Sequence, residues 1–180
     1  VDDAFPGDIV GLVGHSDFGI GDTLTEDASV VFTEIPRFPP ECFSFLHNPN
    51  PSKFKRFREG LEQLLQEGVV QKFELKNSYE KVPILAAVGP LQFEVVQFRL
   101  ESEYGAECRL EPTNWKSVRW VSPEIDPDSL SKTYLPTGCT LAEDIVRQPV
   151  ILFSDDWSCN YFIEKNPGVP LSEFSFKDDL

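Results

Sequence analysis

Two stretches of similar layout set the expected topology of the chain: FKRFREGLEQLLQEGVVQKF at residues 54–73 and GPLQFEVVQFRLESEYGAECRL at residues 89–110. In each stretch, apolar residues recur every three or four positions, and a glycine then precedes a short apolar run. This spacing predicts an amphipathic helix, and a glycine just past its last apolar residue predicts the helix end. Each stretch therefore predicts a helix followed by a strand.

Local signals define the ends of both predicted helices. Ser52 closes the turn 48–52 and is expected to cap the first helix, which Gly68 ends. Pro90 opens the second helix, because proline is favoured in a first turn, and Gly105 ends it. In the first helix, the residues that recur at helical spacing are Phe54, Phe57, Leu61, Leu64 and Leu65. The second helix has a broad apolar face of Leu91, Val95 and Phe98, with Val96 and Leu100 beside them.

Short apolar runs complete the pattern on either side of these helices. With strands expected at 42–46, 69–73, 82–88 and 106–110, the order is β-α-β-β-α-β, which predicts a ferredoxin-like domain. Strands at 118–121 and 150–153 and a helix from Ser154 or Asp155 to Lys165 form a C-terminal αβ extension. Residues 123–139 are predicted to be rich in loops, with one short helical turn. The fold class is α+β.

A proline-rich segment, EIPRFPPE at residues 34–41, marks the expected domain boundary. Proline breaks both helices and central strands, so this segment is predicted to be an extended linker. Before it, apolar runs at 9–13 and 29–32 predict two strands, which are too few to fold alone. We therefore interpret residues 1–36 as the last strands of a β-barrel domain, domain II, and residues 37–180 as a C-terminal α+β domain, domain III.

Composition limits what the chain does. The 180 residues are 41% hydrophobic, which predicts a packed core, and the formal net charge is −14. Residues 1–36 contain eight of the acidic residues and no lysine or arginine. A chain this acidic is not a general binder of nucleic acid, because phosphate contacts need positive charge. Any RNA contact must come from a local basic patch.

Cellular location is inferred from what the sequence lacks. No apolar run approaches the roughly 20 residues of a membrane span, and the first residues do not resemble a signal peptide. Four widely spaced cysteines favour buried free thiols in the cytoplasm over two disulfides, and without a CxxC pair they predict no zinc site. The chain contains no methionine, which suggests a piece excised from a longer protein.

The glycine-rich segment Gly14–Gly21 is the one candidate for nucleotide binding. A phosphate-binding loop needs lysine and a hydroxyl residue after its last glycine, where this chain has Ile20 and Gly21. A turn is therefore favoured. The adjacent carboxylates of Asp155-Asp156 point apart on a helix, and neither histidine can be paired with a nucleophile. The sequence predicts no catalytic residue, no metal ligand and no bound cofactor.

One basic cluster calls for explanation. Lys53, Lys55, Arg56 and Arg58 crowd the start of the first helix, where positive charge opposes the helix dipole. Two interpretations remain open: a solvated face that tolerates poor electrostatics, or a contact for anionic RNA or an acidic protein surface. Lys116 and Arg119 form a second, weaker candidate.

Several segments resemble a known family. GDIVGLVGHSDFGIGDTL at residues 7–24 resembles the end of the second, β-barrel domain of translational GTPases. The segments at 59–73, 88–112 and 114–121 resemble the release factor 3 family in particular. The resemblance covers essentially the whole chain. The acidity of this chain is unusual for a domain that faces the ribosome.

The resemblance implies a function that composition and spacing do not. The parent protein is then a cytoplasmic, monomeric GTPase that acts on the ribosome after peptide release and helps to eject a class-one release factor. Its GTP and magnesium site lies upstream of Val1, and this fragment carries no catalytic residue. Domain III faces the ribosome, contacts small-subunit protein and RNA, and moves as a rigid body on the linker.

Two alternatives remain. The first is the equivalent region of elongation factor G or a relative, which continues into further domains where release factor 3 stops near FKDDL, residues 176–180. The second is a free-standing acidic adapter that binds other proteins.

Overall fold

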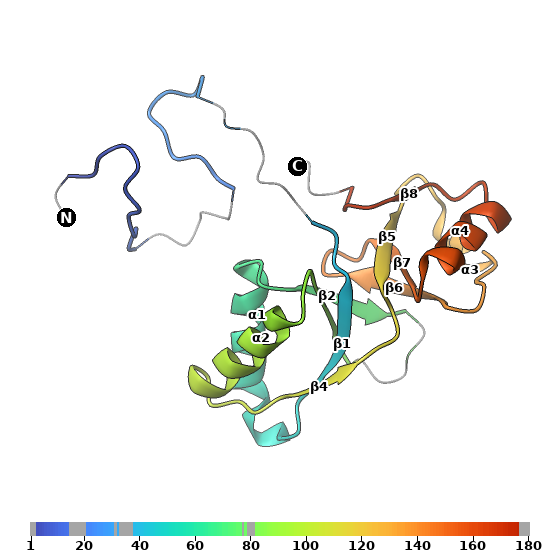
Figure 1. Ribbon diagram of the computed structural model, residues 1–180, viewed down its shortest axis with the longest axis horizontal. Coiled ribbons are helices and arrows are strands. Elements are labelled where there is room, and N and C mark those ends of the chain that lie inside the picture. The colour runs from blue at the N-terminus through green and yellow to red at the C-terminus, as the bar shows by residue number, and fades with distance from the viewer. Residues whose placement is uncertain are drawn as a thin grey trace. The chain divides into compact units, whose positions relative to one another are not determined.

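The structure is a computed structural model that describes residues 3–14, 21–30, 32, 38–76, 78 and 82–176 (Figure 1). The chain divides into two compact units, 1–36 and 37–180. In the first unit, the described residues form turns, bends and irregular segments with exposed side chains, and none of them is assigned to a strand. A strand requires a hydrogen-bonded partner strand. The predicted strands at 9–13 and 29–32, as part of a β-barrel, therefore remain a prediction, and the Gly-rich residues 15–20 lie outside the described part.

The second unit contains every helix and strand of the described chain. The first half contains β1 (Cys42–His47), the 3-10 helix η1 (Pro51–Lys53), α1 (Phe54–Gln66), β2 (Gln71–Leu75), β3 (Ile84–Ala87), α2 (Leu91–Ser102) and β4 (Arg109–Pro112). The second half contains β5 (Ser117–Val121), α3 (Pro127–Ser131), β6 (Cys139–Asp144), β7 (Pro149–Phe153), α4 (Asp156–Lys165) and β8 (Leu171–Ser172).

The strands form one antiparallel sheet in the order β4-β1-β3-β2-β6-β7-β5-β8. The first four strands have the βαββαβ connectivity predicted from the sequence, which confirms the ferredoxin-like half. β2 pairs on its far side with β6, at Phe73–Asp144 through Leu75–Ala142, so the extension continues the same sheet. β2 and β4 begin two and three residues later than predicted, because Val70, Ala106 and Cys108 pack against the helices before the strands start.

Three apolar clusters organise this unit in layers. The first lies between α1, α2 and the first half of the sheet, with Leu64, Leu85 and Leu100 fully buried. The second joins the two halves of the sheet, since the Phe73 ring lies 5.8 Å from that of Trp120. The third packs Phe162 of α4 onto Phe153 of β7. The sheet thus bends around the second cluster, with helices outside each half (Figure 1).

The buried face of α2 is narrower than the apolar face predicted for this helix. Val96 and Leu100 are fully buried, but Leu91, Val95 and Phe98 are exposed. The broad apolar face predicted for this helix is therefore divided: Val96 and Leu100 pack in the core, and the other three residues face solvent. The physical reason is that α2 has apolar residues on both sides, so periodicity alone could not select the side that meets the sheet.

The predicted C-terminal helix is confirmed as α4. Asp155 caps it, since its carboxylate accepts the N–H of Ser158 at 2.7 Å, and Asn166 follows its end. β6 and β8 were not predicted, because neither contains a distinct apolar run: β6 forms a hairpin with β7, and β8 pairs with the distant strand β5.

Candidate functional site

The basic cluster lies at the start of α1, where the structure differs from the predicted cap. Asn50, rather than Ser52, caps the preceding 3-10 turn by accepting the N–H of Ser52 at 3.1 Å. Lys53 is the residue before α1 and makes no side-chain capping bond. The first turn of α1 contains no acidic residue. The N-terminal end of this helix therefore keeps its positive potential.

Lys53 and Arg56 point toward the end of α2. The Lys53 ammonium donates a hydrogen bond to the carbonyl of Gly105 at 2.6 Å, just past the last turn of α2. The Arg56 guanidinium lies on the same side, since a Cβ added at Gly105 would be 3.8 Å from its Nη1. Cations stabilise the negative end of a helix dipole. These two residues therefore favour α2 while they oppose the dipole of α1.

Lys55 and Arg58 project from the outer face of α1. The Lys55 ammonium lies 3.8 Å from Glu59, and the Arg58 guanidinium lies 3.3 Å from Glu62. The Lys55 and Arg58 side chains are 88% and 64% exposed, so water screens both ion pairs. Because exposed pairs of this type contribute little stability, either cation can exchange its glutamate for an external anion at small cost.

The second candidate pair lies in the other half of the sheet. Lys116 precedes β5 and is exposed, whereas Arg119 lies within β5 and is half-buried. The Arg119 guanidinium donates to the Val118 carbonyl at 2.8 Å and to the Glu173 carboxylate at 2.9 Å. Arg119 thus ties β5 to the segment after β8. The structure does not place these residues on the same element as the α1 cluster.

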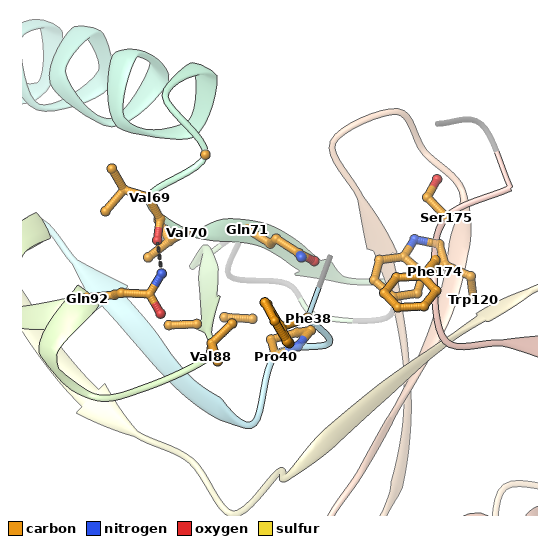
Figure 2. A pocket seen from close by; sticks show the side chains of 13 residues that line it. Phe38, Pro40, Val69, Val70, Gln71, Val88, Gln92, Trp120, Phe174 and Ser175 are labelled. Atoms are coloured by element: carbon orange, nitrogen blue, oxygen red, sulfur yellow. Dashed lines mark hydrogen bonds between the residues drawn. The ribbon is translucent and has the colours of Figure 1, made fainter. Parts of the chain in front are cut away.

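A cavity of about 350 Å³ opens beside the sheet (Figure 2). It is lined by the segment before β1, the start of β2, the end of β3, Trp120, and residues 174 and 175. No acidic or basic side chain lines it. The amide of Gln92 donates to the Val69 carbonyl at 2.8 Å and accepts from the Gly89 N–H at 3.1 Å, so it is already engaged. The Ser175 hydroxyl, also in the lining, donates to the side-chain amide oxygen of Gln148 at 2.9 Å.

A smaller cavity of about 160 Å³ is charged. Four of its five charged residues form ion pairs: Lys72 pairs with Glu74 at 2.8 Å, and Arg147 pairs with Glu143 at 3.3 Å. Asp144 accepts the indole N–H of Trp120 at 3.0 Å. Within the described ranges, no group of three potential metal ligands comes together.

All four cysteines are free thiols, and Cys108, Cys139 and Cys159 have little nucleophilic character. Burial raises the pKa of Cys108 and of Cys139 to about 11, and it also raises the pKa of Cys159. Each of these thiols thus stays protonated at neutral pH, and the thiolate is the reactive form.

No helix in the described part of the chain is long and apolar enough to cross a membrane.

A family model described as "Class II release factor RF3, C-terminal domain" matches residues 32–163. The curated relatives include peptide chain release factor 3 of Synechococcus elongatus, which is 44% identical over 171 residues, 95% of this chain and 30% of the relative. The protein of the same name from Microcystis aeruginosa is 41% identical over 175 residues, 97% of this chain and 32% of the relative. That of Trichormus variabilis is 42% identical over 172 residues, 96% of this chain and 32% of the relative.

The chain therefore spans about a third of the length of the curated relatives that it matches. The family match extends from the first half of the sheet through β5, β6 and β7 and into α4. These comparisons favour release factor 3 over the elongation factor G alternative.

Proposed function

This chain belongs to the class II release factor RF3 family through its C-terminal domain, and we propose that it is the ribosome-facing region of a GTPase that promotes recycling of class-one release factors in translation termination. The observation that carries the proposal is the family match over residues 32–163, together with relatives named peptide chain release factor 3. The domain itself supplies binding surface rather than catalysis.

The longer protein supplies the chemistry in this proposal. GTP and magnesium bind in the part that lies upstream of Val1 in the parent, and the parent acts as a cytoplasmic monomer. The role of residues 37–180 is then to transmit the nucleotide state to the ribosome as one body, and the three joined apolar clusters favour this role.

The expected ribosomal contact is the outer face of α1, with small-subunit RNA or protein as the partner. Lys55 and Arg58 support it, because both are exposed and held only by screened ion pairs. Lys53 and Arg56 contribute less, since they also serve the end of α2. Lys116 remains a secondary candidate for a ribosomal contact. Arg119 is a weaker one, because its guanidinium already forms an ion pair with Glu173.

The contact is tested with the full-length parent protein carrying Lys55→Glu and Arg58→Glu. We expect affinity for purified ribosomes in co-sedimentation to fall by about tenfold at low salt, and by less at high salt, because ions screen exposed charges. Lys132→Glu with Arg147→Glu is the matched control. It changes net charge equally, and Arg147 is 70% exposed with an ion pair 3.3 Å long, like Arg58. Equal losses in both double variants would reject a specific contact at α1.

The recycling role needs a separate assay on the parent protein. Labelled class-one release factor is bound to termination complexes, and its dissociation is followed after adding the parent with GTP or without nucleotide. GTP-dependent acceleration by the parent supports the proposal. Acceleration of tRNA–mRNA translocation instead, with no effect on the release factor, would favour elongation factor G behaviour.

A further inference from the structure

Helix α2 carries apolar side chains on two opposite faces. One face packs on the sheet and α1, where Val96 and Leu100 are fully buried and Phe93 is partly buried. On the other face, Leu91 is 69% exposed, Val95 44% and Phe98 69%. We call Leu91, Val95 and Phe98 the α2 stripe.

The α2 stripe has the geometry of a helix that docks in a groove. Its residues are spaced i, i+4 and i+7, so they lie along one side of the helix over two turns. A helix that is apolar all round is normally buried on all sides. Among the residues that the structure describes, the sheet and α1 cover one side of α2, and the stripe is left to solvent.

The charges beside the stripe define the partner. Glu94 and Glu101 lie on the same exposed side, three residues from Leu91 and from Phe98. The one cation of α2, Arg99, is held by Glu67 and by Glu103 at 2.8 Å, and its side chain is 23% exposed. The stripe therefore has an acidic border to which α2 itself contributes no unpaired cation, in a chain of net charge −14.

We propose that the α2 stripe docks into an apolar groove, bordered by lysine or arginine, on a basic protein of the ribosome. This inference rests on the proposed function for its location. RNA is disfavoured as the occupant, because Glu94 and Glu101 repel phosphate, and only Phe98 of the three stripe residues offers a stacking surface for a base. A basic protein satisfies both features, since apolar side chains fill the groove and its cations meet the two glutamates.

The apolar part is tested by Val95→Asp and Phe98→Asp in the full-length protein, with co-sedimentation on purified ribosomes. We expect each variant to weaken binding by about tenfold, because a charge replaces an anchor in a desolvated groove. Ile163→Asp on α4 is the matched control for Val95→Asp, since Ile163 is β-branched, helical and 48% exposed. Circular dichroism verifies that each variant stays folded. A loss from Ile163→Asp as large as that from Val95→Asp would overturn the proposal.

The acidic border is tested by Glu94→Gln with Glu101→Gln. We expect binding to weaken by roughly threefold at low salt and to approach wild type at high salt, because the pairs at a rim are screened. Glu107→Gln with Glu124→Gln is the control, since both residues are exposed, lie outside α2 and change the charge equally. Tighter binding of the Glu94 and Glu101 variant would indicate an anionic partner and overturn the proposal.

The occupant is identified by Phe98→p-benzoylphenylalanine and irradiation on ribosomes, with the adduct located by mass spectrometry. An adduct on a ribosomal protein, beside lysine or arginine, supports the proposal. Adducts on ribosomal RNA or on the protein's own other residues, or no adduct, would overturn it.

If Lys55→Glu with Arg58→Glu weakens ribosome binding but the stripe variants do not, this inference alone fails. If the wild-type protein does not bind ribosomes, the proposed function and this inference both fail.

Discussion

Gly60 sets how closely α1 and α2 approach. A Cβ at this position would lie 2.7 Å from Cδ2 of Tyr104 and 2.8 Å from Cδ2 of Leu100. In an isolated helix, alanine is favoured over glycine by about 1 kcal/mol. The overlap is larger in effect, because Leu100 is fully buried and cannot easily move aside.

We therefore expect Gly60→Ala to lower the free energy of unfolding by about 1–3 kcal/mol, as overpacking does. Urea unfolding followed by circular dichroism measures this change. Gly89→Ala is the control, since nothing lies within 4 Å of its added Cβ. A more stable Gly60→Ala protein would mean that α1 and α2 move apart readily and that the higher helix propensity of alanine outweighs the overlap.

At the scale of elements, Arg99 links the end of α1 to α2. Its guanidinium bonds to both carboxylate oxygens of Glu67, which directly follows α1, and to Glu103. The hydrogen bond from Arg99 lowers the pKa of Glu67 below its usual value of 4.5. A lowered pKa in the folded state means that the stabilisation is present above about pH 4.5 and is lost as the pH falls further.

We expect Arg99→Gln to cost about 1 kcal/mol at pH 7, a modest value because water screens this partly exposed cluster. The coupling energy between Arg99 and Glu67, from a double-mutant cycle with Glu67→Gln, should diminish below pH 4.5. Urea titrations at pH 7 and at successively lower pH measure it. A coupling that stays constant down to pH 3 would contradict the assignment.

At the scale of residues 37–180, the apolar cluster between the two halves of the sheet determines how cooperatively the domain unfolds. It takes Phe43, Phe73 and Ile84 from the first half of the sheet, and Val118, Trp120 and Leu152 from the second. The Phe45 ring also lies 5.7 Å from that of Trp115, again across the two halves. Neither half can lose its structure without exposing this shared core.

We therefore expect a single unfolding transition in which helical circular dichroism and tryptophan fluorescence change together. Phe73→Ala should lower the free energy of unfolding by about 3–5 kcal/mol, because Phe73 is fully buried, and should preserve this coincidence. Two separated transitions in the wild-type chain would show that the halves are independent.

The boundary at residue 36 gives a further prediction at this scale. Every residue of the three clusters lies between Phe43 and Leu171, so residues 37–180 contain their own core. We expect removal of residues 1–36 to leave the Tm of the remainder unchanged within about 2 °C, because no cluster residue is lost. A large decrease in Tm would place the domain boundary elsewhere.

The sequence alone was sufficient for features that depend on neighbouring residues. The ends of α1 and α2 follow from Gly68 and Gly105, which adopt positive φ values of 69° and 60°. The cap of α4 follows from Asp155, and the βαββαβ order follows from helix and strand signals that each occupy a short window. The predicted basic cluster of α1 is likewise a local feature, visible in residues 53–58.

Only the tertiary structure decided which faces and charges are engaged. Which side of α2 packs inward depends on the sheet, and Leu91, Val95 and Phe98 lie exposed. Lys53 and Arg56 were predicted as a possible contact for an external partner, but they lie against the end of α2. Antiparallel packing brings the end of α2 to the start of α1, where these two residues are. β8 pairs with β5, and β6 joins the first half of the sheet through β2, both of them strands distant in sequence. Contacts of this kind join residues far apart in the chain, so no local pattern can encode them.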